Sequence, residues 1–142
     1  MTELTNLGEA LSFIKNRYFK RKLQEYMTFL MKEDLEIRGI LLFGSVARGE
    51  ERMDEDHVSD IDLIIISDEL PEDLWERRRF TSNLTRPVNA GIQALWWTSE
   101  EITSHVNQKY HLVLDALDEG KILYDPDNLL HRLRKRMFLD LV

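Results

Sequence analysis

The stretch that decides the fold is LLFGSVARG, residues 41–49, followed after an acidic segment by SDIDLIII, residues 59–66. The segments Ile37–Phe43 and Ile61–Ile66 are short and apolar on both faces, which is typical of strands buried on both sides of a sheet. The first strand ends at Gly44-Ser45, where the chain can turn into a helix. The sequence therefore predicts two buried strands, with polar residues at the end of one and at the start of the other.

Apolar residues at helical and extended spacings alternate on either side of these strands. This order predicts an α/β (α+β) fold, with a small sheet covered by helices, in a single domain, 1–142, whose core spans about 37–124. A capping box, Thr98-Ser-Glu-Glu101, starts one helix, and Gly120 ends it. The other elements are expected as a leading helix at about 7–34, a helix from Pro71 toward Asn83, strands at Gly91–Trp97 and Lys121–Tyr124, and a C-terminal helix at about 127–140.

The composition restricts the class of protein. With 142 residues, the chain has room for one hydrophobic core. It has no cysteine, so a metal ion would have to be held by oxygen or imidazole ligands, which favours Mg²⁺, Mn²⁺ or Ca²⁺. The formal net charge of −7 argues against indiscriminate binding of nucleic acid phosphates. No segment approaches the roughly 20 apolar residues of a membrane span, so we expect a cytoplasmic protein with no membrane partner.

Two carboxylates stand two positions apart at the start of the second strand. Asp60 and Asp62 project from the same face of this strand, because side chains alternate along it. At that distance the two charges repel one another unless a cation lies between them. Hard oxygen ligands favour Mg²⁺ or Mn²⁺. The pair therefore predicts a divalent cation site, with two solvated aspartates of no function as the alternative.

The turn at Gly44-Ser45 is the second candidate for chemistry. Glycine lets the main chain approach a phosphate closely, and the backbone N–H groups and the serine hydroxyl can donate hydrogen bonds to it. Arg48 can add a positive charge four residues after the glycine. The pattern is neither a Walker A loop nor a nucleophile elbow. It predicts a cradle for the phosphates of a nucleotide, and a tight strand–helix connection is the alternative.

In combination, the two motifs are more specific than either alone. The order Leu42-Phe43-Gly44-Ser45, then Ser59-Asp60-Ile61-Asp62-Leu63 on the next strand, resembles the minimal nucleotidyltransferase (MNT) family of the DNA polymerase β superfamily. The resemblance covers most of the chain, up to Tyr124, and implies a polymerase β-like fold with a mixed sheet. It also implies that Gly44 and Ser45 contact the triphosphate, that Arg48 is a further phosphate contact, and that Asp60 and Asp62 are catalytic and bind magnesium.

The resemblance implies a reaction and partners as well. Members of this family move a nucleoside monophosphate from a nucleoside triphosphate to a hydroxyl group, with Mg²⁺ or Mn²⁺ as cofactor. ATP is the expected donor. Family members often act as antitoxins that pair with a small helical toxin of the HEPN type and modify it. We therefore expect a nucleotide-binding transferase of a toxin–antitoxin pair, with a HEPN-type partner.

One position departs from the family pattern. The family carries a third carboxylate on the neighbouring strand, whereas residues 77–99 contain no acidic residue, and counting back from Thr98 places Gln93 at this third position. An amide oxygen can bind a cation but cannot accept a proton near neutral pH. The alternative function is therefore a degenerate module that binds nucleotide or masks a partner. Glu50, Asp54 and Asp56 lie in a loop that is slightly longer than the family norm. That one of them supplies the missing negative charge is not favoured.

Other polar and aromatic residues are interpreted as structural. Arg77–Arg79 and Arg132–Arg136 are expected on solvated helix faces, and contact with tRNA through them stays open without being favoured. The apolar stripe of the leading helix is expected in the core or in a dimer seam, which leaves a homodimer open. The remaining candidates are His57, expected in a solvated loop, His105 and His111, expected on different helix faces, and Trp96-Trp97, of which at least one ring is expected in the core.

Overall fold

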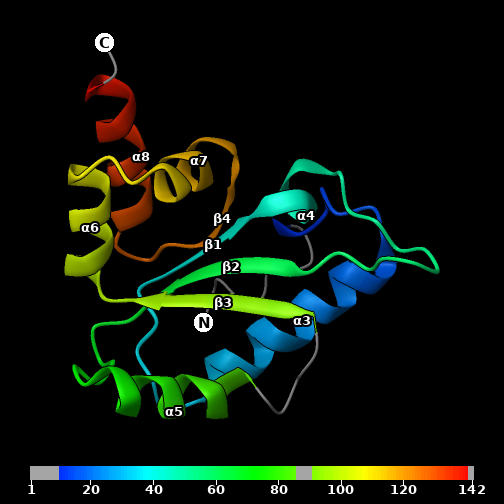
Figure 1. Cartoon of the computed structure of the whole chain (residues 1–142), viewed down its shortest axis with the longest axis horizontal. Helices are drawn as coiled ribbons and strands as arrows, with labels where there is room; N and C mark the ends of the chain where they lie inside the picture. Colours follow the sequence, from blue (N-terminus) through cyan, green and yellow to red (C-terminus); the bar gives the residue numbers. More distant parts are fainter. Residues whose placement is uncertain (1–9, 86–90, 141–142) are drawn as a thin grey trace.

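The strands form one mixed four-stranded sheet. The structure, a computed structural model, describes residues 10–85 and 91–140. The sheet has the order β3-β2-β1-β4, with β1 antiparallel to both of its neighbours and β2 parallel to β3 (Figure 1). This mixed sheet covered by helices confirms the predicted fold class. The strands are β1 (Gly39–Phe43), β2 (Ile61–Ile66), β3 (Ile92–Trp97) and β4 (Lys121–Tyr124).

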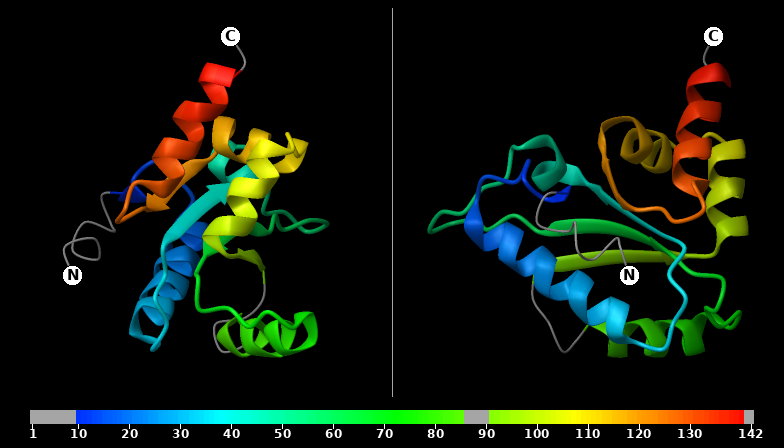
Figure 2. Two further views of the ribbon diagram at one scale, coloured as in Figure 1. Left: turned by 90° about the vertical axis from the view of Figure 1, so that its left-hand side faces the viewer. Right: turned by 180° about the vertical axis from the view of Figure 1, so that it is seen from behind.

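Helices cover both faces of the sheet, and Figure 2 shows the two layers from two further directions. One face carries α3 (Arg17–Lys32) and α5 (Leu74–Thr85). The opposite face carries α6 (Ser99–Asn107), α7 (His111–Glu119) and α8 (Leu129–Asp140). A single short helix, α4 (Gly44–Arg48), follows β1 directly. No helix in the described part of the chain is long and apolar enough to span a membrane.

Alternation along the strands divides the apolar side chains between two cores. Successive strand residues point to opposite faces, so β1 and β2 contribute to both cores. The core on the α3 side includes Ile40, Leu42, Leu63 and Ile65, and the core on the α6–α8 side includes Leu41, Ile64 and Ile66. Burial on both faces explains why these two strands were predicted from apolar runs rather than from alternating patterns.

The prediction of a leading helix over 7–34 is wrong at its start. The helix begins at Arg17, because the Asn16 side chain accepts hydrogen bonds from the backbone N–H groups of Tyr18 (2.8 Å) and Phe19 (3.3 Å) and so caps it. Residues 1–9 lie outside the described residues. The apolar stripe packs against the sheet, which places it in the core rather than in a dimer seam. Its buried members are Phe19, Leu23, Tyr26, Met27 and Leu30.

The prediction of one continuous helix over 98–119 is also wrong. The capping box at its start is confirmed, with a hydrogen bond in each direction between Thr98 and Glu101. The helix then breaks after Asn107, where Lys109 adopts a φ of 57°. The break lets α7 change direction and lie beside α4, where it forms one wall of the site described below. Gly120 ends α7, as predicted.

The other boundaries shift by a few residues. The first strand starts at Gly39 rather than at Ile37, and the helix expected from Pro71 begins at Leu74. The predicted strand Lys121–Tyr124 is observed with the same limits. Trp96 is buried, as expected for one of the two tryptophans.

Two arginines that were predicted to be solvated are engaged in packing. Arg77 donates to both carboxylate oxygens of Glu101 (2.8 and 2.9 Å), which ties α5 to α6. Arg134 donates to the carbonyl oxygens of Leu117 (2.7 Å) and Gly120 (3.0 Å) and thereby satisfies the C-terminal end of α7. Consecutive residues on a helix point in directions about 100° apart, so one arginine of each basic segment turns inward.

Candidate functional site

The site lies at one end of the sheet, where β1 ends and where β2 and β3 begin. Phe43 is paired with Asp62 across β1 and β2, and Asp62 is paired with Gln93 across β2 and β3. Paired residues on adjacent strands project to the same face. The three side chains therefore share the face that α6, α7 and α8 cover, and Asp60 immediately precedes β2 at the same end.

Gln93 contacts the aspartate pair directly. Its side-chain Nε2 donates a hydrogen bond to Oδ2 of Asp60 at 2.9 Å. The residue counted from the sequence into the third position is therefore beside the pair in the structure. The amide orients the Asp60 carboxylate but contributes no negative charge.

The Asp62 carboxylate is half-buried and forms no ion pair with any residue that the structure describes. Burial raises the pKa of Asp62, the negative charge of Asp60 raises it further, and the more distant charge of Arg48 lowers it. Two carboxylate groups and an amide oxygen are hard donors of the kind that Mg²⁺ and Mn²⁺ prefer. Among residues 10–85 and 91–140, no group of three or more His, Cys, Asp or Glu side chains is placed to hold a metal ion. The oxygen atoms of Asp60, Asp62 and Gln93 thus suit a divalent cation chemically, but only two of these three ligands carry a charge.

The turn that precedes α4 lies against the Asp62 carboxylate. Gly44 has a φ of +77°, and a Cβ atom at this position would lie 2.3 Å from Oδ2 of Asp62. Only glycine combines this left-handed backbone with such a close approach. The geometry joins the two sequence motifs, because the backbone of the turn contacts one carboxylate of the pair.

The two polar residues of α4 differ in their partners. In the described part of the chain, the Ser45 side chain has no hydrogen-bond partner. Arg48 is exposed, and its guanidinium donates to Glu50 at 3.0 Å and lies 3.7 Å from a carboxylate oxygen of Glu119 on α7. The arginine thus bridges the turn and α7, and a phosphate would have to compete with two carboxylates for it.

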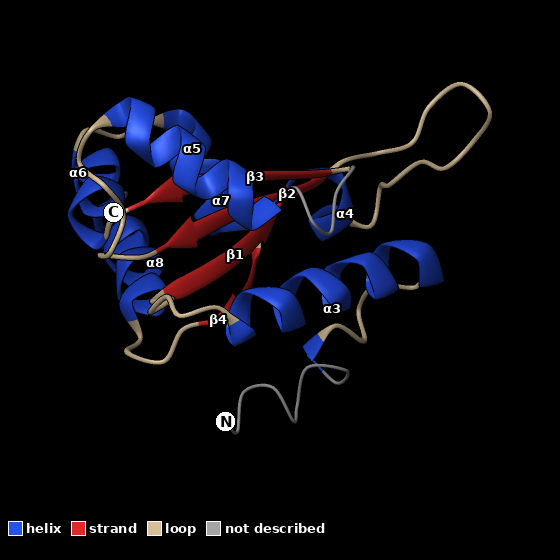
Figure 3. Ribbon diagram, turned by 90° about the horizontal axis from the view of Figure 1, so that it is seen from below, coloured by secondary structure: helices blue, strands red, loops and turns tan. Residues whose placement is uncertain are grey.

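The acidic loop does not complete the cation site. It forms a hairpin, closed by a bridge between Met53 and Val58, that protrudes from the body of the molecule (Figure 3). The Asp54 carboxylate accepts hydrogen bonds from the backbone N–H groups of Asp56 and His57, so it stabilises the loop itself. The geometry therefore gives no support to the idea that this loop supplies a third negative charge to the cation site. His57 is exposed, as expected.

A cavity beside the aspartate pair was missed from the sequence. It has a volume of about 330 Å³ and lies between α4 and α7. The α7 residues in its wall are spaced so that they share one face of the helix, and this could have been recognised from the sequence. The spacing does not show that this face turns toward the site. The lining residues are Phe43, Gly44, Arg48, Leu112, Asp115, Ala116 and Glu119.

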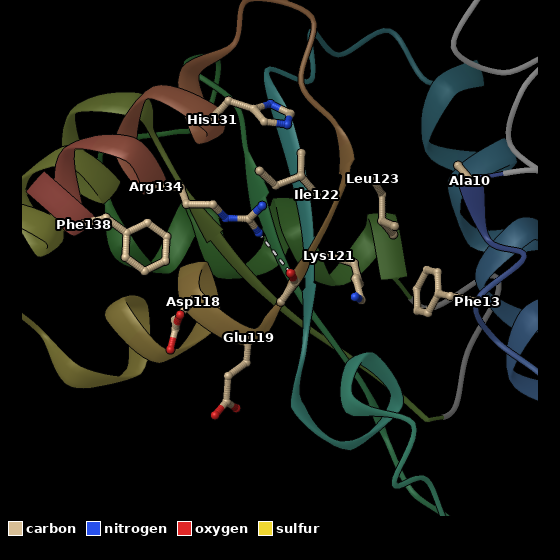
Figure 4. Close-up of a pocket in the computed structure, with 11 residues that line it drawn as sticks. Ala10, Phe13, Asp118, Glu119, Lys121, Ile122, Leu123, His131, Arg134 and Phe138 are labelled. Atoms are coloured by element: carbon tan, nitrogen blue, oxygen red, sulfur yellow. Dashed lines mark hydrogen bonds between the residues drawn. The ribbon is translucent and has the colours of Figure 1, made fainter.

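A second cavity, of about 470 Å³, lies on the outer side of β4 (Figure 4). Its cationic groups are already engaged. Arg134 caps α7, His131 Nδ1 lies 2.6 Å from the Asp125 carboxylate, and Lys121 Nζ lies 5.7 Å from the centre of the Phe13 ring. These contacts hold α8 against the end of α7 and the segment after β4, so the cationic groups of this cavity serve packing. Its acidic residues, Asp118 and Glu119, are exposed.

Comparisons with known proteins agree with this arrangement. The family model described as "Polymerase beta, Nucleotidyltransferase" matches residues 24–129. A crystal structure of a toxin–antitoxin with AMP-PNP shares the fold, with 14% identity, coverage of 85% of both chains and a TM-score of 0.51. The toxin–antitoxin MntA–HepT shares it with 12% identity, 86% coverage of both chains and a TM-score of 0.51. No curated protein sequence matches the chain.

Proposed function

Because the chain belongs to the polymerase β nucleotidyltransferase family, we propose that it transfers a nucleoside monophosphate from ATP to a hydroxyl group of a HEPN-type partner protein in the cytoplasm. The family match also confirms the resemblance predicted from the two motifs. The choice of partner is supported by two fold neighbours that are toxin–antitoxin proteins, and the choice of nucleotide by the AMP-PNP of one of them. The reaction would depend on Mg²⁺ or Mn²⁺.

One observation carries the proposal: the backbone of Gly44 lies against the Asp62 carboxylate. A triphosphate held at this turn would lie within reach of a cation held by Asp60 and Asp62. Such a cation, when bound, would neutralise phosphate charge and favour ionisation of the acceptor hydroxyl. The backbone and hydroxyl donors of Gly44 and Ser45 would contact the phosphates.

Arg48 would contribute positive charge to the same phosphates. Its present partners, Glu50 and Glu119, are exposed, so these ion pairs contribute little and can be exchanged for a phosphate. In the reaction the acceptor oxygen bonds to the α-phosphorus and pyrophosphate leaves. The amide of Gln93 cannot accept the hydroxyl proton, so the proton passes to water or to a group elsewhere.

The alternative is a catalytically degenerate module that binds nucleotide or masks its partner. The observation that favours it is the hydrogen bond from Gln93 to Asp60, because it puts an amide beside the pair, where the resemblance to the family leads us to expect a third carboxylate. The two functions differ in one outcome. A transferase labels its acceptor, whereas a degenerate module binds ATP or the partner and leaves the acceptor unlabelled.

Gln93→Asp is expected to raise the rate of nucleotidyl transfer about tenfold or more. A positioned general base accelerates a reaction roughly 10²–10⁴-fold, and aspartate, whose side chain is shorter than that of glutamine, recovers part of this acceleration. The test incubates the protein with labelled ATP, Mg²⁺ and a HEPN-type partner, and measures the initial rate of label transfer. Gln93→Asn is the matched control, because it shortens the side chain equally without adding charge, and it is expected not to raise the rate.

The results separate the proposal from its alternative. Label transfer by the natural chain supports the transferase. Absence of label with the natural chain and with Gln93→Asp, while ATP or the partner is still bound, would establish the degenerate module. Absence of binding to ATP, to Mn²⁺ and to the partner would contradict both.

A further inference from the structure

We propose that the outer face of α5 is a dimerisation surface, on which α5 of a second copy of this chain packs in antiparallel orientation. The outer face is formed by Trp75, Arg78, Arg79, Ser82 and Asn83. The inference goes beyond the proposed function, because it concerns the assembly of the chain and requires no nucleotide.

The start of α5 exposes two large apolar side chains. Leu74 is 74% exposed and Trp75 is 73% exposed, more than any other large apolar side chain that the structure describes. The helix lies on the opposite side of the sheet from α7, so it can be covered without closing the candidate site (Figure 1). Tryptophan and arginine are enriched at the centres of protein–protein interfaces, and the outer face of α5 combines both.

A hollow of about 390 Å³ runs along the outer face. The residues that line it recur at steps of three and four, so they form one stripe along the helix, against which a second helix can pack. The Trp75 ring of the second copy can enter this hollow. There it would lie beside the guanidinium groups of Arg78 and Arg79, and a guanidinium packs favourably on the face of an indole ring.

The charges along α5 make this helix complementary to itself. Glu72 and Asp73 immediately precede the helix, Glu76 lies in its first turn, and Arg78 and Arg79 follow; all five side chains are exposed. None of them forms an ion pair with another residue in the ranges 10–85 and 91–140. When each Trp75 lies in the hollow of the other copy, antiparallel helices bring the acidic start of each one opposite the two arginines of its partner.

This distribution of charge also decides between occupants of the face. Parallel packing of two copies would place like charges opposite one another, which is unfavourable. A nucleic acid strand would be attracted by the two arginines, but the three carboxylates around Trp75 would repel its phosphates. The charges therefore favour a second copy of the chain in a symmetric, antiparallel pair.

Analytical ultracentrifugation of the full chain, without nucleotide, tests the dimer. Two single helices form an interface at the small end of the range, so we expect a monomer–dimer equilibrium at micromolar concentrations. Trp75→Ser is expected to weaken association at least about tenfold, because loss of a central aromatic side chain typically costs this much. Its thermal unfolding midpoint should be unchanged, since the side chain is exposed. Leu139→Ser, at an exposed position of α8, is the matched control and should associate normally.

Charge reversal tests the antiparallel arrangement. Arg78→Glu/Arg79→Glu makes the face acidic, and Glu72→Lys/Glu76→Lys makes it basic. Asp73 is kept, because its carboxylate accepts a hydrogen bond from the backbone N–H of Trp75 (3.0 Å) at the start of α5. Each variant alone is expected to be monomeric, since like charges then meet in the pair. An equimolar mixture of the two is expected to form heterodimers, which native mass spectrometry identifies by their mass.

A control variant separates this pairing from attraction between the overall charges. Arg17→Glu/Arg21→Glu reverses two exposed arginines of α3 and therefore has the same net charge as the variant of the α5 arginines. Alone it should dimerise like the natural chain. It is not expected to gain heterodimers when mixed with Glu72→Lys/Glu76→Lys.

Each outcome supports or overturns the inference. Heterodimers from the two charge variants of α5, with loss of association in Trp75→Ser, would support it. A natural chain that is monomeric at every concentration, or a dimer that persists in Trp75→Ser, would overturn it. A mixture of the charge variants that stays monomeric would exclude the antiparallel pair. None of these results bears on nucleotidyl transfer, which the labelled-ATP assay measures separately.

Discussion

Asp62→Asn is expected to lower nucleotidyl transfer about a thousandfold. Under the proposed function the residue is one of the two aspartates that hold the cation, and its carboxylate lies against the turn that would hold the phosphates. Loss of a bound cation removes several kcal/mol of transition-state stabilisation, and about 4 kcal/mol corresponds to a factor of roughly a thousand. Initial rates with labelled ATP, together with Mn²⁺ binding followed by electron paramagnetic resonance, measure the effect.

The same substitution is expected to stabilise the metal-free protein. Burial and the charge of Asp60 raise the pKa of Asp62, so the folded state disfavours the ionised form at neutral pH. A group with a raised folded pKa costs stability as pH rises through that pKa, and a neutral amide avoids this cost. Thermal unfolding in EDTA should therefore show a higher midpoint for Asp62→Asn, and an unchanged midpoint for Asp118→Asn, an exposed control. An active Asp62→Asn protein, or one that still binds Mn²⁺ as tightly, would contradict the assigned site.

The second large effect is expected for Gly44→Ala. The added Cβ atom would lie 2.3 Å from the Asp62 carboxylate, so either the carboxylate or the turn must move. The left-handed backbone adds about 1–2 kcal/mol of strain for a residue with a Cβ atom. We expect transfer to fall by at least about a hundredfold, because a displacement of about 1 Å at a reacting site can cost that much.

Gly49→Ala separates backbone strain from displacement of Asp62. Gly49 also has a left-handed backbone, with φ of 72°, but a Cβ atom there would meet nothing within 4 Å. Urea denaturation should show a loss of about 1–2 kcal/mol for this variant, with Mn²⁺ affinity and transfer largely retained. Equal loss of Mn²⁺ affinity in both variants would show that the close approach at Gly44 has no specific role.

Much of the fold was predictable from local patterns. The strands at residues 61–66 and 121–124 have the predicted limits, and the capping box at Thr98 starts its helix where expected. Helix ends were less predictable, since the Asn16 cap lies inside a continuous apolar stripe. The spacing of apolar residues shows which residues share a face of a helix. It does not show where a helix is interrupted, because the apolar stripe continues across the break.

The residues of the candidate site were predicted from the sequence, but the contacts between them were not. Gly44 and Asp62 were recognised from separate motifs, and Gln93 from a count along the strand. The sequence contained no sign that Gly44 touches Asp62 or that Gln93 binds Asp60. Such contacts depend on strand register, which is set by the pairing of segments that are far apart along the chain.

The sequence by itself determined the buried strands, the aspartate pair and the glycine turn, because strand period and residue chemistry are local properties. Only the tertiary structure decided that α7 turns beside α4 and brings Asp115 and Glu119 to the cavity, and that Arg77 and Arg134 face inward. These arrangements arise from the packing of distant segments against one another, and the free energy of that packing is not encoded in any single stretch of the chain.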